Sequence, residues 1–119
     1  LLNNYCYSND SMLCYKCIWS YYMLGNTSAI NYYRYLINNS KDYINVNIAV
    51  QKLAELGDIE TAYPVMEKIM NEENSIKGGI MRILKAMGDD KSIQLIKKTL
   101  NDKNEANKDY AKKILKNIK

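Results

Sequence analysis

The chain has 119 residues, enough for one domain, and its 47% hydrophobic and 25% charged residues are the usual proportions of a folded globular protein. No apolar run approaches the roughly 18 residues that span a bilayer, and the first residues lack the basic and apolar segments of a signal peptide, so we expect a soluble, cytoplasmic protein without membrane association. Histidine is absent, which removes the commonest general base and metal ligand and argues against an enzyme.

Apolar residues recur at three- and four-residue steps along the whole chain, which predicts an all-α protein of about seven helices. The first three expected helices cover about 10–24, 28–38 and 43–56. Their expected N-caps are Ser8 or Asn9, then Thr27, then Asp42, and the first and third helices are expected to stop at Gly25 and Gly57.

Four more helices are expected over about 59–71, 76–87, 90–100 and 105–118. Asp58, Ser75 and Asp89 or Asp90 are the candidate N-caps of the first three of these. Pro64 falls inside the helix expected at 59–71, where a proline removes one backbone hydrogen bond. That helix should therefore start a turn later than Asp58 suggests, or bend at Pro64.

A motif recurs every 31 residues in the second half of the chain. Leu53-Ala-Glu-Leu56-Gly57-Asp58 reappears as Leu84-Lys-Ala-Met87-Gly88-Asp89, and Leu115-Lys-Asn-Ile118 is a truncated third copy. Aligning alternate helices on this period gives small or apolar columns, such as Cys17, Ala49, Ile80 and Ala111. A fixed period of this length is typical of stacked helical hairpins that bury their apolar faces against one another.

The stretch from Gly57-Asp58 through Ala62, Pro64 and Glu72-Glu73 to Gly88-Asp89 resembles the short HEAT-like repeats of phycobilin-lyase-type proteins. The resemblance implies one domain over 1–119, a right-handed α-solenoid of stacked antiparallel helix pairs, with units at about 1–24 (partial), 25–56, 57–87 and 88–119. It covers 42–119 best, whereas residues 1–41 keep only the spacing. A start without methionine is compatible with a fragment of a longer protein. Tetratricopeptide repeats are the nearest alternative, but they need a 34-residue period.

In such a solenoid the second helices line a concave face that binds partners. The positions that point outward on these helices are aromatic in the first unit and basic in the last two, and Trp, Tyr and Arg are enriched at binding hot spots. The predicted partner-binding residues are Tyr15, Trp19, Tyr22, Gln51, Arg82, Lys85, Lys113 and Lys116. The competing interpretation is that Trp19 and the tyrosines only close off an incomplete first repeat.

These patterns favour a non-catalytic module or scaffold that binds a protein partner. Residues 91–119 carry nine basic and three acidic residues, which leaves open a nucleic-acid-binding protein with a basic concave groove. Because 15 of the 17 basic residues are lysine, a solvated surface explains this charge as well. A toxin-immunity or regulatory protein is a third possibility that the resemblance allows.

Three cysteines, Cys6, Cys14 and Cys17, include one Cys-x-x-Cys spacing. A zinc site needs four ligands, and with no histidine the chain would have to supply a carboxylate or a second copy. We therefore expect buried thiols, no metal and no cofactor.

Overall fold

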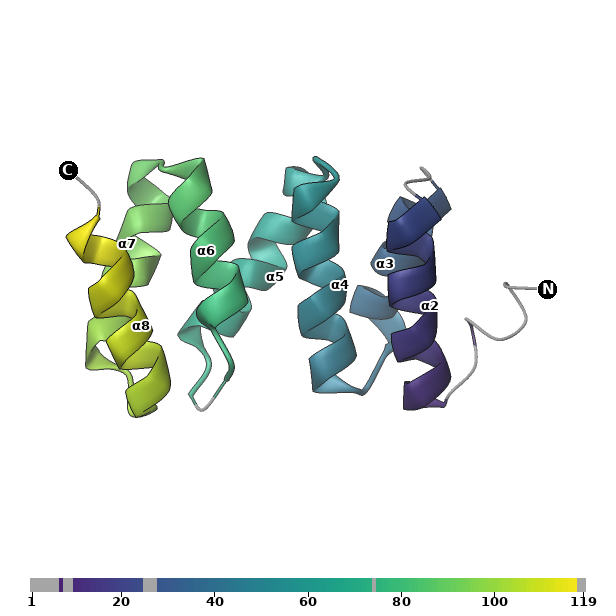
Figure 1. Cartoon of the computed structure of the whole chain (residues 1–119), viewed down its shortest axis with the longest axis horizontal. Coiled ribbons are helices and arrows are strands. Elements are labelled where there is room, and N and C mark those ends of the chain that lie inside the picture. The colour runs from purple at the N-terminus through teal and green to yellow at the C-terminus, as the bar shows by residue number, and fades with distance from the viewer. Residues whose placement is uncertain (1–6, 8–9, 25–27, 74, 118–119) are drawn as a thin grey trace. The chain divides into compact units, whose positions relative to one another are not determined.

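The computed structural model describes residues 7, 10–24, 28–73 and 75–117, and within them it contains helices and no strand. The helices are α2 (Ser11–Leu24), α3 (Ser28–Asn39), α4 (Tyr43–Glu55), α5 (Ile59–Asn71), α6 (Gly78–Met87), α7 (Asp90–Lys98) and α8 (Glu105–Lys116), with a 3-10 turn at Thr99–Asn101 (Figure 1). The prediction of an all-α protein with about seven helices is confirmed over the described residues.

The helices form two compact units, residues 1–62 and residues 63–119, which we call unit 1 and unit 2. The division falls inside α5, next to Pro64. The helix starts at Ile59 with the proline in its interior, so the expectation of a later start is wrong. The interpretation of residues 1–119 as one domain stays a prediction.

In unit 1, α2 packs against α3 and α4, and α3 packs against α4. Two tyrosines of α3 are fully buried in this core. Tyr33 donates a hydrogen bond from its hydroxyl to the Ile18 carbonyl at 2.8 Å, and Tyr32 donates one to the Cys14 carbonyl at 3.3 Å. Burial raises the pKa of both phenols well above the usual value. Part of the tyrosine-rich N-terminal third is therefore core, which the sequence pattern did not separate from surface.

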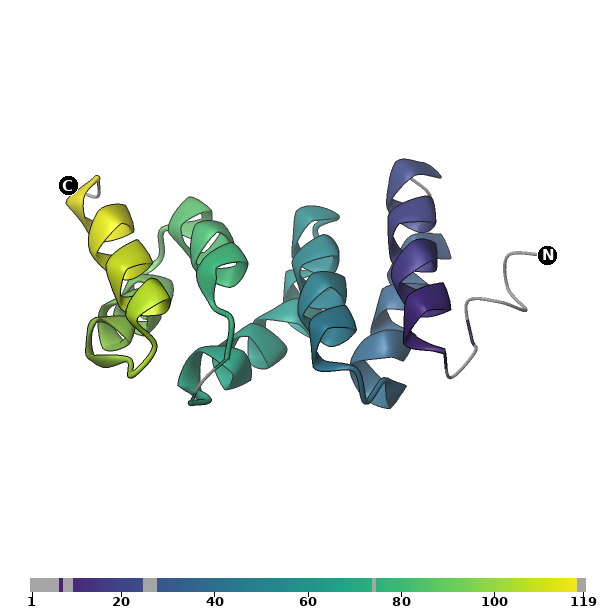
Figure 2. The ribbon, with the colours of Figure 1, turned by 60° about the horizontal axis from the view of Figure 1, so that its bottom comes forward.

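In unit 2, α6 packs against both α7 and α8. The fully buried side chains include Ile80, Met81, Leu84, Ile96 and Ala111. A polar contact joins the starts of α6 and α8, because Asn107 donates from Nδ2 to the Ser75 carbonyl at 2.6 Å and accepts from the Lys77 N–H at 3.2 Å. The N-terminal ends of α6 and α8 therefore lie together, as Figure 2 also shows.

A buried ion pair lies near the N-terminal ends of α6 and α8. Lys77 Nζ bonds Asp102 Oδ2, and the two side chains are only 5% and 4% exposed. Burial by itself raises the pKa of Asp102, but the hydrogen bonds from the Lys77 ammonium and the Asn104 N–H outweigh it, and the pKa lies below the usual value. The pair ties the segment before α6 to the segment before α8.

Two of the predicted N-caps are confirmed, and one is wrong. Asp42 and Asp89 accept hydrogen bonds from the N–H groups of Asn45 and Ser92, as expected of N-caps. Ser75 does not cap α6, because its hydroxyl donates to the carbonyls of Ile69 and Glu72 at the end of α5.

At the start of α2, Asp10 accepts from the Met12 and Leu13 N–H groups at 2.9 and 3.2 Å. The predicted caps Ser8, Asn9 and Thr27, and the predicted stop at Gly25, lie outside the described residues. The stops at Gly57 and Gly88 are supported by their positive φ angles of 95° and 70°, a conformation that favours glycine.

Candidate functional site

Helix α2 is apolar around most of its circumference, although only one side of it packs against unit 1. Cys14, Cys17, Ile18 and Tyr21 are buried. The opposite side exposes large apolar side chains: Met12 at 62%, Tyr15 at 41%, Trp19 at 40%, Tyr22 at 36% and Met23 at 81%. A surface helix of a globular protein normally carries polar residues on this side. We call the surface of Tyr15, Trp19 and Tyr22 the aromatic face.

The three rings of the aromatic face contact one another edge to face. The ring centroids of Tyr15 and Trp19 lie 6.3 Å apart with an interplanar angle of 68°, and those of Trp19 and Tyr22 lie 6.2 Å apart at 86°. These are favourable geometries for aromatic pairs. The spacing of three and four residues along α2 places the rings in one row, so the sequence prediction that these residues share a surface is supported by their contacts.

Lys52 of α4 completes this surface. Its Nζ lies 3.9 Å from the ring centroid of Tyr22 and 4.7 Å from that of Trp19. Glu55 holds the same ammonium at 3.4 Å, and the Lys52 side chain is only 12% exposed. Cation–π contacts of this kind fix ring positions as well as adding binding energy. Lys52 was not predicted, because its ring partners are 30 and 33 residues earlier and no spacing in the sequence places it against them.

Gln51, predicted to bind a partner, is hydrogen-bonded to a neighbour on its own helix. Its Nε2 donates to Asn47 Oδ1 at 2.6 Å, and Asn47 Nδ2 in turn donates to Tyr43 Oη at 3.4 Å. Gln51 is half-buried in this row of side chains along α4. No contact between Gln51 and the aromatic rings is among those of the described residues.

The other four predicted residues belong to unit 2. Arg82 and Lys85 lie on α6, and Lys113 and Lys116 on α8. Arg82, Lys113 and Lys116 are exposed, and Lys85 is half-buried. Helices α6 and α8 pack together with their N-terminal ends adjacent, and we call these four cations the basic face. The eight predicted residues therefore fall into two groups, one in each unit.

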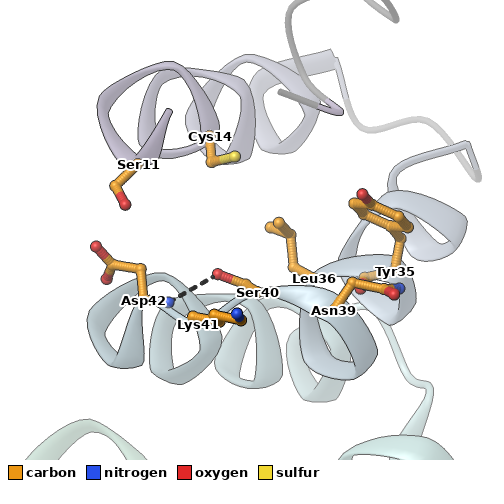
Figure 3. A pocket seen from close by; sticks show the side chains of 8 residues that line it. All are labelled: Ser11, Cys14, Tyr35, Leu36, Asn39, Ser40, Lys41 and Asp42. Atoms are coloured by element: carbon orange, nitrogen blue, oxygen red, sulfur yellow. Dashed lines mark hydrogen bonds between the residues drawn. The ribbon is translucent and has the colours of Figure 1, made fainter. Parts of the chain in front are cut away.

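A cavity of about 320 Å³ in unit 1 is a second place to look for a site. Ser11 and Cys14 of α2 face Leu36, Ser40 and Asp42 across it (Figure 3). Two polar side chains that line it are hydrogen-bonded to backbone groups of the loop and of α4. Ser40 Oγ accepts from the Asp42 N–H at 3.1 Å, and Asp42 caps α4. Hydrogen bonds from the Asn45 N–H and the Ser11 hydroxyl hold the pKa of Asp42 below its usual value. This arrangement is that of a helix-capping loop.

The cysteines differ from one another. Cys14 is a buried thiol, as expected, whereas Cys17 is disulfide-bonded, so the expectation of a buried thiol is wrong for Cys17. Cys6 lies outside the described residues. Among the described residues no group of three or more His, Cys, Asp or Glu side chains is arranged to hold a metal ion. None of the described helices combines the length and apolar character needed to cross a bilayer.

Comparison with known proteins gives no family assignment. No protein-family model matches the chain, and neither the curated proteins nor the solved structures contain a significant match.

Proposed function

We propose that the protein is a non-catalytic interaction module of HEAT-like repeats, and that it binds a protein partner through the aromatic face of unit 1. The observation that carries the proposal is the exposed apolar side of α2. Large exposed apolar surfaces on soluble proteins mark interaction sites more often than chance, and the residues here are the types enriched at hot spots.

The repeat interpretation has support inside each unit. In unit 2, Asn107 bonds to Lys77 and Ser75, which precede it by 30 and 32 residues, on either side of the predicted period of 31. In unit 1, Lys52 contacts Tyr22 and Trp19, which precede it by 30 and 33 residues. Helices one period apart are therefore neighbours in both halves of the chain. The right-handed solenoid and the HEAT-like assignment are part of the proposal.

The aromatic face suits a binding site because its rings are held in place before a partner arrives. Trp19 has contacts with Tyr15, Tyr22 and Lys52, so little side-chain freedom remains to be lost on binding. A tryptophan can bury up to about 250 Å². With 40% of Trp19 still exposed, about 100 Å² would be buried by a partner, which is roughly 2.5 kcal/mol or about 60-fold in affinity.

The test is the affinity of the partner for matched variants. A partner captured with the intact chain is titrated against the wild type, Trp19→Ala and Tyr15→Ala, with the fluorescence of the single tryptophan as a second readout where it is retained. Ile76→Ala is the control, because Ile76 is an apolar side chain of unit 2 with 62% exposure. We expect Trp19→Ala to weaken binding by about 60-fold and Ile76→Ala to leave it unchanged. Equal binding by all variants would refute the proposal.

Trp19→Ala also removes contacts within unit 1, so its melting temperature should fall somewhat. The titrations are therefore made well below the melting temperature of each variant. Tyr15→Ala removes only one edge-to-face ring contact, so a loss of binding in this variant reflects the aromatic face and not unfolding.

The basic face of unit 2 supports a second candidate function, binding of nucleic acid. Its four cations lie on α6 and α8, which pack together, and α6 itself contains no acidic residue. Four phosphate contacts would give an affinity for duplex DNA that falls steeply with salt. Retardation of DNA at low salt that Lys113→Ala and Lys116→Ala weaken additively would favour this function, and no retardation at low salt would exclude it.

A cytoplasmic location stays part of the expectation from sequence. The disulfide at Cys17 argues in the other direction, because disulfides are rare in reducing compartments and common in oxidising ones. Localisation of a tagged chain, with thiol labelling of the freshly isolated protein, distinguishes the two.

A further inference from the structure

A glycosylation motif lies at the end of helix α3. Asn38-Asn39-Ser40 has the pattern Asn-x-Ser/Thr, in which the amide of the first residue can accept an oligosaccharide and the third residue supplies a hydroxyl group. Two more copies of the pattern precede it, Asn9-Asp10-Ser11 and Asn26-Thr27-Ser28, but each includes residues outside the described ones. Among the three copies, the one at Asn38 lies wholly within the part of the chain that the structure describes.

The pattern by itself is weak evidence for a modified residue. The chain has 15 asparagines and ten serines and threonines, so about one such pattern is expected by chance. A site that is used also needs an accessible asparagine and a chain that enters the secretory compartment. The structure bears on both requirements.

Asn38 meets the first requirement. It lies in the last turn of α3, on the side opposite the buried Tyr33 and Leu36, and its side chain is exposed. Its amide forms no hydrogen bond with another residue that the structure describes, whereas Asn39 donates from Nδ2 to the Tyr35 carbonyl at 3.0 Å. A carbohydrate on Asn38 would therefore extend into solvent without breaking a described contact of unit 1.

The disulfide at Cys17 bears on the second requirement. Disulfides persist in oxidising compartments, such as the lumen of the endoplasmic reticulum and the cell exterior, and are rare in the cytosol. Asparagine-linked carbohydrate is found on proteins of this same secretory route. A disulfide and an exposed acceptor asparagine are independent features of the chain, and both indicate one compartment. We propose that Asn38 carries an asparagine-linked oligosaccharide.

The modification is a glycosyl transfer from a lipid-linked oligosaccharide pyrophosphate, catalysed by a transferase of the secretory pathway. A bond forms between Asn38 Nδ2 and the anomeric carbon of the first sugar, and the bond from that carbon to the pyrophosphate breaks. One amide proton leaves with the lipid pyrophosphate, and no oxidant or reductant is needed. The proposal uses no residue of the aromatic face, so it can fail without affecting the proposed function.

The test is peptide mapping of the full chain, isolated from the cells that produce it. Enzymatic release of asparagine-linked glycans in heavy-oxygen water converts each glycosylated asparagine to a labelled aspartate, which mass spectrometry locates. We expect the label at Asn38 and none at Asn31, an exposed asparagine on the same side of α3 that is not part of the pattern. An unlabelled Asn38 would overturn the proposal. So would equal label at Asn31, because it would show deamidation in place of glycan release.

Variants produced in the same cells test whether the pattern directs the modification. Asn38→Gln removes the acceptor, and Ser40→Ala removes the hydroxyl group but keeps Asn38, so each should lose one glycan in the intact mass. Ser40→Thr keeps the pattern and Asn31→Gln lies outside it, so both should retain every glycan. Far-UV circular dichroism verifies that each variant is folded. A Ser40→Ala chain that keeps the glycan on Asn38, or a Ser40→Thr chain that loses it, would contradict the proposal.

Discussion

Asp102→Asn tests the buried ion pair of unit 2. The substitution keeps the shape of the side chain but removes its charge, and the Lys77 ammonium, whose side chain is 5% exposed, remains without a carboxylate. Removing one partner of a buried pair usually costs about 3–5 kcal/mol, because the remaining charge is uncompensated. We expect about 3 kcal/mol, since the asparagine oxygen can still accept the hydrogen bond that the Asn104 N–H now donates at 2.8 Å.

The corresponding change in melting temperature depends on how the chain unfolds. Unfolding entropies of about 2.1 cal/mol/K per residue give a fall of roughly 12 °C if the whole chain unfolds together, and roughly twice that if unit 2 unfolds alone. Urea unfolding followed by circular dichroism gives the free energy, and calorimetry gives the number of transitions.

Two further variants make this test specific. Glu73→Gln breaks the Lys103–Glu73 pair, whose side chains are 74% and 71% exposed, and should have almost no effect. Adding Lys77→Met to Asp102→Asn removes the buried charge and should recover part of the lost stability. A loss below about 1 kcal/mol for Asp102→Asn, or a double variant less stable than the single one, would refute this reasoning.

Three other predictions concern the remaining polar contacts. Asp89→Ala removes the N-cap of α7 and should lower the free energy of unfolding in urea by about 1 kcal/mol. Tyr33→Phe removes a hydroxyl that is hydrogen-bonded in the core of unit 1 and should also cost about 1 kcal/mol, measured by thermal unfolding. Since Asp42 and Asp102 have pKa values below the unfolded value of about 3.9, their stabilisation is present above that pH and is lost as the pH falls below it. Urea titrations between about pH 5 and 2 should therefore show a free energy of unfolding that falls as the pH falls. A constant free energy of unfolding over this range would contradict the lowered pKa values of Asp42 and Asp102.

Helix positions were predictable from the sequence because the local signals agree. Apolar spacing, Asp42 and Asp89 as N-caps, and Gly57 and Gly88 as stops all point to boundaries close to those observed. Ser75 was assigned wrongly because a serine between two helices can bond to either, and only the tertiary contacts show that its hydroxyl bonds back to α5.

The candidate site was predictable only in part. The spacing of Tyr15, Trp19 and Tyr22 showed that they share one side of α2, but spacing cannot show which tyrosines are buried, and Tyr32 and Tyr33 proved to be core. Lys52 was missed because its partners are 30 and 33 residues away in sequence, and its contact depends on how α4 lies against α2. Periodicity specifies the side of a helix, whereas the contacts of a long flexible side chain need the packed structure.

The central claim, that the aromatic face binds a protein partner, is tested most directly by photo-cross-linking in cells. A benzophenone amino acid is placed at Tyr15, in the aromatic face, or at Ile76, in unit 2, where the native side chains are 41% and 62% exposed. We predict a defined protein adduct from position 15 and none from position 76, although position 76 is the more accessible. The same adducts from both positions, or an adduct from position 76 alone, would contradict the account.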